Sequence, residues 1–153
     1  MREQRVTQFI GGAPDDVFRL LVSPKRLPEW NAAIVAVVDA PEELTPGVEW
    51  VVRLSALGQS WSSRSTVLEL DPVDRRFVYR SQSDDGNPSY ADWSWHVADQ
   101  AGGCVVAVSY ALHPATFWRR VLLAKIRGRQ LLRREVPASL RALASLAVPV
   151  RDV

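Results

Sequence analysis

The sequence predicts an α+β fold: a seven-stranded curved antiparallel sheet wrapped around a long C-terminal helix, with two short helices between strands 1 and 2. The first observation behind this prediction is a series of six apolar-alternating stretches, separated by turn residues at spacings of about ten residues, which is typical of an antiparallel meander. The second is helical periodicity over residues 115–148, and the third is a helix-start signal directly after a first short strand. The 153 residues fit one domain, residues 1–153, with a single core.

The N-terminal part predicts one strand and two short helices. Val6–Ile10 alternates as a strand does and ends at a pair of glycines. Ala13–Asp16 then begins a helix, because it carries a proline and two acids into the first turn, where acids complement the positive end of the helix dipole. A second helical piece, Pro24–Glu29, is irregular because Pro28 disfavours helical geometry at the residue before it.

The middle of the chain predicts six strands. Alternation is clearest in the second of them, where Trp50 and Leu54 share an apolar face while Glu49 and Arg53 lie on the opposite face. The polar loop Ser83–Pro88 is the expected hairpin tip, because its Asp, Gly and Asn residues tolerate a positive φ. The six predicted strands are Ile34–Val38, Val48–Leu57, Ser60–Leu70, Phe77–Ser81, Tyr90–Val97 and Cys104–Leu112.

The last predicted element is the helix over residues 115–148. Four of its arginines recur at seven-residue steps and drift by only ~20° per step, so they are expected to share one solvent face: Arg120, Arg127, Arg134 and Arg141. Pro137 lacks a backbone donor, so we expect two stacked pieces, the second beginning near Pro137. A curved sheet and one helix leave a space between them that can take an apolar ligand.

Composition and motifs exclude several kinds of site. A single cysteine, Cys104, excludes an intramolecular disulfide and a thiolate metal site, and is expected to be a buried strand residue. His96, expected to face solvent, and His113, expected in a turn, lack metal-ligating spacing. The glycine pairs lack the context of a phosphate-binding loop. The sequence therefore predicts no metal and no cofactor.

Charge is distributed unevenly along the chain. Residues 1–114 hold 10 Lys and Arg against 15 Asp and Glu, whereas residues 115–148 hold 8 Lys and Arg against one acid. Nucleic-acid binding needs basic residues and exposed aromatics over a whole face, so we expect no nucleic-acid partner. The basic helix face is interpreted as solvated, with an anionic partner or a lipid surface as the alternative. Without a signal peptide or a spanning apolar stretch, the expectation is a cytoplasmic protein that does not insert into membranes.

Four segments carry a resemblance to a known superfamily. They are residues 13–31 (APDDVFRLLVSPKRLPEWN), 46–58 (PGVEWVVRLSALG), 67–81 (VLELDPVDRRFVYRS) and 93–110 (WSWHVADQAGGCVVAVSY). In this order, and with the amphipathic C-terminal helix, they resemble the SRPBCC, or START-like, superfamily of birch-pollen-allergen-like helix-grip proteins, in particular its bacterial polyketide cyclase/dehydrase-like branch. The resemblance covers residues from about 5 to 147. It departs from the pattern at Cys104, where a threonine often follows the two glycines.

The resemblance implies a hydrophobic cavity between the sheet and the C-terminal helix. It also implies roles that range from lipid or hormone carriage to polyketide cyclisation and co-chaperone activity, so the fold alone does not fix the function. The residues expected to line the cavity and bind a ligand are Trp30, Trp50, Leu54, Trp61, Tyr79, Trp93, Trp95, Tyr110, Phe117 and Val121. The alternative is that the rings fill the core and the two tyrosine hydroxyls bond to backbone carbonyls.

The strand Ser60–Leu70 leaves two registers open because its first half is polar on both faces. If Trp61 and Val67 point inward, Arg64 points to solvent. In the reversed register, Arg64 joins Ser60 and Ser62 in a polar cluster within the cavity, where it can anchor a carboxylate or an enolate.

Three functions follow as hypotheses. The first is a protein, monomeric or homodimeric, that binds a small hydrophobic molecule, with an aromatic or polyketide-like compound as one possibility. The second is an enzyme of the polyketide cyclase or dehydratase type acting in the same cavity, and the sequence leaves open whether turnover occurs and which residues would be catalytic. The third is a module that binds a partner protein or acts as a chaperone.

Overall fold

The computed structural model describes residues 3–56, 58–84, 89–113, 127, 129 and 131–147. The strands are β1 (Gln4–Ile10), β2 (Ile34–Asp39), β3 (Glu49–Ala56), β4 (Gln59–Asp71), β5 (Arg76–Ser83), β6 (Tyr90–Gln100) and β7 (Gly103–His113). The helices are α1 (Pro14–Leu21), α2 (Leu27–Trp30) and α4 (Val136–Leu146), with a 3₁₀ turn at Pro24–Arg26 and a π-helical turn at Leu131–Glu135.

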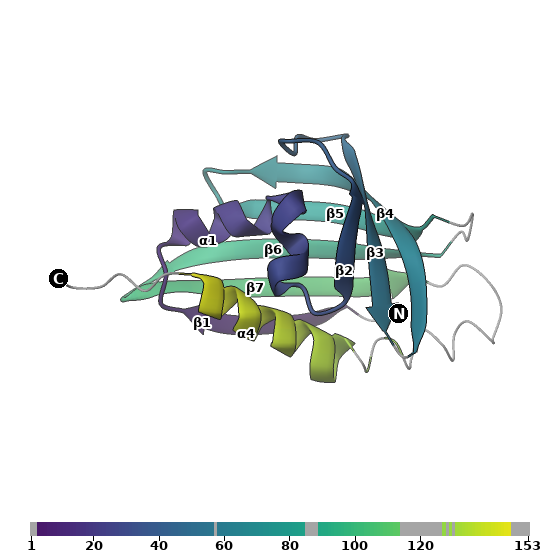
Figure 1. Cartoon of the computed structure of the whole chain (residues 1–153). Coiled ribbons are helices and arrows are strands. Elements are labelled where there is room, and N and C mark those ends of the chain that lie inside the picture. Colours follow the sequence, from purple (N-terminus) through teal and green to yellow (C-terminus); the bar gives the residue numbers. More distant parts are fainter. Residues whose placement is uncertain are drawn as a thin grey trace.

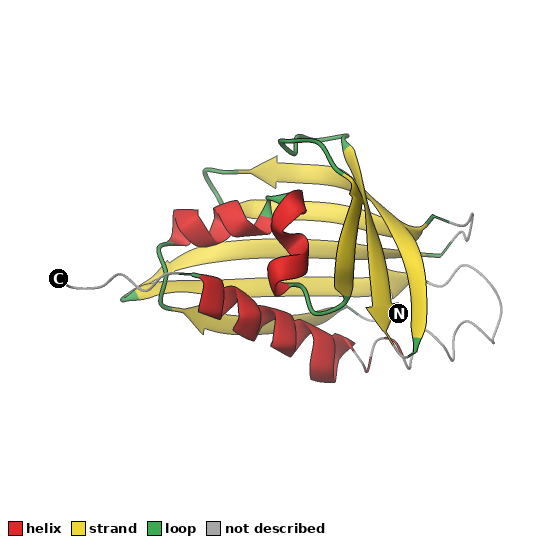
Figure 2. Ribbon diagram, in the orientation of Figure 1, coloured by secondary structure: helices red, strands yellow, loops and turns green. Residues whose placement is uncertain are grey.

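The seven strands form one antiparallel sheet in the order β1-β7-β6-β5-β4-β3-β2. The sheet is curved, and α1, α2 and α4 lie on the same face of it (Figures 1 and 2). A register shift between Val67 and Glu69 interrupts the β4–β5 pairing, and the β2–β3 pairing has two further shifts. Bulges bend a strand and increase its twist, so these shifts help to curve the part of the sheet from β2 to β5. The predicted fold class is thus confirmed.

β1 and β7 approach each other closely where β7 begins. Gly103 is the first residue of β7, and a Cβ atom placed on it would lie 2.1 Å from the backbone oxygen of Ile10. Cys104, the next residue, is paired with Ile10 and is fully buried, as expected from the sequence. Only glycine fits at position 103, because any side chain there would overlap the backbone of β1.

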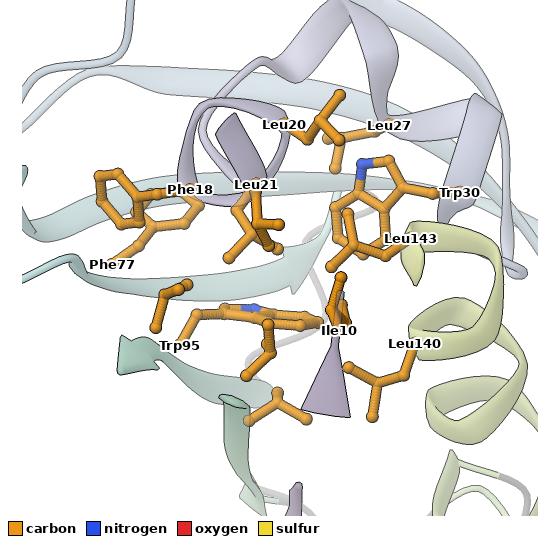
Figure 3. Packing of buried hydrophobic residues seen from close by; sticks show 14 of the residues in the cluster. Ile10, Phe18, Leu20, Leu21, Leu27, Trp30, Phe77, Trp95, Leu140 and Leu143 are labelled. Atoms are coloured by element: carbon orange, nitrogen blue, oxygen red, sulfur yellow. The ribbon is translucent and has the colours of Figure 1, made fainter. Parts of the chain in front are cut away.

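The end of the sheet beneath α1, α2 and α4 is packed solid. Trp30 of α2 meets Trp95 of β6 edge to face, with ring centroids 5.5 Å apart. Leu140 and Leu143 of α4 fill the space beside them (Figure 3), and both are buried. The Ser139 hydroxyl of α4 also accepts a hydrogen bond from the Ala32 amide at 2.9 Å, which ties the helix to the loop after α2.

The C-terminal helix changes its winding just before Pro137. A π-helical turn runs through Leu131–Glu135, and α4 begins at Val136 with Pro137 in its first turn. Proline cannot donate to the carbonyl four residues earlier and its ring pushes that carbonyl away, so the helix ahead of it opens to the wider turn. The predicted irregularity near Pro137 is present as this π-helical turn, but the helix runs without a break from Leu131 to Leu146. The predicted start of the helix at Ala115 lies outside the described residues.

Candidate functional site

A cavity of about 560 Å³ occupies the interior at the other end of the sheet. Its wall is built from β3, β4, β5 and β6, from the last residues of β7, and from residues near α2 and the π-helical turn. This volume lies within the range of small-molecule sites, roughly 300–1,000 Å³. The fold therefore combines a solid end, under the three helices, with a hollow end.

One wall of the cavity is a row of aromatic rings from successive strands. Trp50 of β3 lies edge to face with Tyr79 of β5, with centroids 5.0 Å apart, and Tyr79 stacks on Trp93 of β6 at 6.3 Å. All three rings line the cavity. They do so because Trp50, Tyr79 and Trp93 share the inward face under the two-residue alternation of their strands. Such a wall offers a large apolar area with a few polar edges.

A second wall is made of small hydroxyl side chains. Ser63 and Ser65 of β4 stand opposite Ser83 and Ser81 of β5, and all four line the cavity. The Oγ atoms of Ser65 and Ser81 are 2.7 Å apart, and the Ser63 hydroxyl donates to the carbonyl of Gln82 at 3.2 Å. Serines are too small to reach the opposite wall, so this part of the interior stays open while keeping hydrogen-bonding groups on its surface.

Tyr79 is a neutral phenol at physiological pH. Its hydroxyl accepts a hydrogen bond from the indole N–H of Trp95 at 3.4 Å. Burial raises the pKa of Tyr79 to about 12, although the hydrogen bond from Trp95 acts in the opposite direction. A phenol with this pKa can donate a hydrogen bond to a ligand but does not serve as a base near pH 7.

Tyr110 of β7 carries a buried hydroxyl that finds no hydrogen-bond partner among the described residues. Its side chain is 2% exposed, and its ring stacks on Trp93 with centroids 5.0 Å apart. Burial raises the pKa of Tyr110 to about 12, and the positive charge of Arg127 acts against this shift. The polar end of Tyr110 is therefore close enough to Arg127 to interact with its charge.

Replacing Tyr110 by phenylalanine is expected to change the pH dependence of stability. A phenol whose folded pKa exceeds its unfolded pKa stabilises the fold fully below about pH 10, and this contribution is lost as the pH rises towards 12. Between these values the wild type should lose up to about 1.4 kcal/mol per pH unit relative to Tyr110→Phe. Urea denaturation of both proteins from pH 8 to 11.5 measures this difference. A constant difference across the range would show that the Tyr110 hydroxyl is not buried as described.

Arg127 places a positive charge in the wall of the cavity. Its side chain is 21% exposed, and its guanidinium forms an ion pair with the buried carboxylate of Glu135 in the π-helical turn. The guanidinium also lies over the ring of Trp61, 5.4 Å from the centroid. Burial lowers the pKa of Arg127 to about 10, which leaves the side chain charged at neutral pH. The sequence prediction that Arg127 belongs to a solvent-facing row is wrong, whereas Arg134 and Arg141 are exposed as predicted.

A cluster of four side chains stands at one edge of the cavity. Arg80 donates two hydrogen bonds to Asp92, at 2.7 and 3.2 Å, and its guanidinium lies 4.1 Å from the centroid of Tyr90. The imidazole of His113 stacks on Tyr90 at 4.6 Å, with its Nε2 atom 3.6 Å from an oxygen of Asp92. Tyr90 and His113 both line the cavity. His113 is the last residue of β7, so its predicted place in a turn is wrong.

The structure brings five of the ten predicted ligand-binding residues together around the cavity: Trp50, Leu54, Trp61, Tyr79 and Trp93. Trp30, Trp95 and Tyr110 are buried but do not line it, since the first two pack against each other with ring centroids 5.5 Å apart and Trp93 stacks on the third. Phe117 and Val121 lie outside the described residues. That these residues bind a ligand stays a prediction.

The two registers that the sequence left open for β4 are resolved. Trp61 lines the cavity and Val67 is buried, whereas Arg64 is exposed and donates to Glu49 at 2.9 Å and to Asp84 at 3.0 Å. Arg64 therefore does not reach the cavity.

Sequence reasoning missed the serine wall. The signal was available, because the same alternation that turns Trp61 inward also turns Ser63 and Ser65 inward. The place of Arg127 in the cavity wall was missed for a different reason. A π-helical turn separates Arg127 from α4, and Pro137 is the one local sequence signal for that turn.

The described residues offer neither a metal site nor a membrane-spanning helix. No cluster of three or more His, Cys, Asp or Glu side chains among them could hold a metal ion. In that part of the chain no helix combines the length and the apolar character needed to cross a membrane.

Comparisons with known structures agree on the fold. Major latex-like protein 151 from Panax ginseng superposes with a TM-score of 0.75 at 16% identity, covering 97% of this chain and 98% of its own. Protein CV1439 from Chromobacterium violaceum gives 0.70 at 19% identity, covering 95% and 96%. The di-domain ARO/CYC StfQ from the steffimycin biosynthetic pathway gives 0.71 at 19% identity, covering 95% of this chain but 50% of StfQ. At these identities the likeness concerns the fold alone.

Family membership rests on the sequence. No curated protein matches the chain. The family described as "Polyketide cyclase / dehydrase and lipid transport" matches residues 1–148, which is nearly the whole chain and includes every strand that builds the cavity. This chain is therefore a member of the polyketide cyclase/dehydrase and lipid transport family.

Proposed function

We propose that this protein binds a small, mainly apolar molecule with an aromatic ring system in the cavity between the sheet and the C-terminal helix. The single observation that carries the proposal is the cavity of about 560 Å³ beside the packed core. Apolar atoms that line a cavity lack the close contacts that a side chain or a ligand would supply. A bound molecule restores those contacts.

The composition of the wall supports an aromatic ligand with polar substituents. Trp50, Tyr79 and Trp93 present ring faces and edges, against which a flat ring system can stack. Ser65 and Ser81 place hydroxyls on the adjoining wall, where they can bond to hydroxyl or carbonyl groups of the ligand. The arrangement thus fits a molecule that is apolar over most of its surface and polar along one edge.

The cavity-filling variant Ala91→Phe tests the proposal. Ala91 of β6 lines the cavity beside the aromatic row, so a benzyl group there would occupy the space of the ligand. Binding of N-phenyl-1-naphthylamine, followed by its fluorescence, is expected to weaken at least tenfold in this variant. The measurement is a fluorescence titration at constant protein concentration.

Ala98→Phe on the same strand is the matched control. Ala98 is not part of the cavity wall, so the same change in volume should leave the affinity within about twofold of the wild type. Equal affinities of the wild type and Ala91→Phe, or no binding to the wild type at micromolar probe concentrations, would overturn the proposal.

A second candidate function is a cyclase or dehydratase that acts in the same cavity. The positive charge of Arg127 in the wall favours it, because a fixed guanidinium can stabilise an enolate as it forms. Incubation with a synthetic poly-β-keto thioester, followed by mass spectrometry, separates the two functions. Loss of one water from the compound, dependent on the protein, indicates the enzyme, whereas recovery of the unchanged compound from a stable complex indicates the binding protein.

A further inference from the structure

The described residues of the cavity wall carry positive charge and no negative charge. Among the described residues that line it, Arg127 is charged at neutral pH, whereas none is an aspartate or a glutamate. The carboxylate of Glu135 is near, but Glu135 is buried and does not belong to the wall. Among the described wall residues, the charged group available to a molecule in the cavity is therefore the Arg127 guanidinium.

Contacts on two sides hold the guanidinium in this position. Its Nη1 atom pairs with Oε2 of Glu135, whose side chain is only 9% exposed, and its face lies over Trp61. If Arg127 turned away to solvent, a buried carboxylate would be left without its counter-ion, which is costly. A guanidinium has five N–H donors, so the pair with Glu135 leaves others for a second acceptor.

A second donor lies nearby without an acceptor. The hydroxyl of Tyr110 is buried, has no hydrogen-bond partner among the described residues, and belongs to a ring stacked on Trp93 of the cavity wall. Buried polar groups without a partner are rare, and each calls for an explanation such as a water or a ligand. The Tyr110 hydroxyl is within reach of the charge of Arg127, although Tyr110 itself does not line the cavity.

We infer that the ligand is an aromatic acid, whose ring system lies along Trp50, Tyr79 and Trp93 and whose carboxylate or sulfonate group is bound by Arg127. This inference rests on the proposed function and names the chemical class of its ligand. The anion supplies acceptors to the remaining N–H groups of the guanidinium, and a charge-assisted hydrogen bond of this kind is stronger than a neutral one. Glu135 acts as a positioning residue, because it contacts Arg127 and not the ligand.

Two fluorescent probes that differ in one anionic group test the inference. N-phenyl-1-naphthylamine is neutral, and 8-anilino-1-naphthalenesulfonate has the same ring system with an added sulfonate. We expect the wild type to bind the sulfonate at least tenfold more tightly than the neutral probe. In Arg127→Gln the affinity for the sulfonate should fall about tenfold to a hundredfold, while that for the neutral probe stays within about twofold.

Two further variants keep the result interpretable. Arg127→Gln leaves Glu135 buried and unpaired, so the double variant Arg127→Gln/Glu135→Gln removes both charges together and should show the same selective loss. Arg53→Gln removes a positive charge from an exposed position of β3 outside the cavity, and should leave both affinities unchanged.

The outcomes separate this inference from the proposed function. If both probes bind equally well and the double variant changes neither affinity, the anion site is wrong and the apolar cavity stands. If neither probe binds the wild type, the proposed function itself fails. Loss of sulfonate binding in Arg53→Gln to the same extent as in the double variant would show a surface charge effect and would also overturn the anion site.

Discussion

Replacing Gly103 by alanine is expected to lower the free energy of unfolding by about 3 kcal/mol or more. The new Cβ atom would lie 2.1 Å from the backbone oxygen of Ile10 and 2.9 Å from the Cα atom of Gly11. These are backbone atoms of the segment paired with β7, so relief of the overlap requires β1 to move away from its partner and lose ladder hydrogen bonds. Urea denaturation followed by circular dichroism measures the change.

Gly11→Ala is the control for this prediction. Gly11 is next to Ile10, but a Cβ atom on it would meet nothing within 4 Å, so its stability should change by about 0.5 kcal/mol or less. Equal effects of the two substitutions would contradict the close approach of β1 and β7.

Leu143→Ala is expected to cost about 2–5 kcal/mol of unfolding free energy. Leu143 is fully buried in the solid end of the core, beside Leu140 and the Trp30–Trp95 pair, so truncation leaves a new cavity among well-packed neighbours (Figure 3). Thermal or urea denaturation of the two proteins gives the value directly.

Leu112→Ala removes the same atoms at the hollow end. Leu112 is partly buried and already faces the cavity, so the change enlarges an existing space and should cost only about 1 kcal/mol. A core that is solid at one end and open at the other therefore predicts a larger loss of unfolding free energy for Leu143→Ala than for Leu112→Ala. If Leu112→Ala destabilised the protein as much as Leu143→Ala, the hollow end would in fact be filled.

Most of the fold could be predicted from local signals. Alternating side chains set each strand, and turn residues such as Gly102, with its φ of +81°, set the boundaries between them. Pro137 set the change in the last helix, because its effect on the backbone is local and does not depend on tertiary contacts. Each of these features depends on a few neighbouring residues, so it could be predicted from the sequence alone.

The candidate site was only partly predictable. Alternation gives the face of the sheet on which a side chain lies, but not which part of that face a helix covers. For this reason Trp50 and Trp93 line the cavity while Trp95, on the same face, is packed under Trp30. Recognising that difference requires knowing where α2 and α4 lie on the sheet.

Arg127 shows a second limit. Heptad spacing places Arg127 and Arg134 on one face only if the helix keeps its ordinary winding throughout. The π-helical turn Leu131–Glu135 has more residues per turn and rotates the following residues by roughly a quarter turn relative to those before it. The buried Glu135 then lies where it can pair with Arg127.

The most direct test of the hollow end is the set of intermolecular nuclear Overhauser effects between bound N-phenyl-1-naphthylamine and leucine methyl groups. The cavity wall contains Leu27, Leu54, Leu112 and Leu131, whereas Leu21, Leu140 and Leu143 are buried elsewhere. We predict contacts from the probe to leucines of the first group and none to those of the second. Contacts only to exposed methyl groups, such as those of Leu68 and Leu132, would contradict the account.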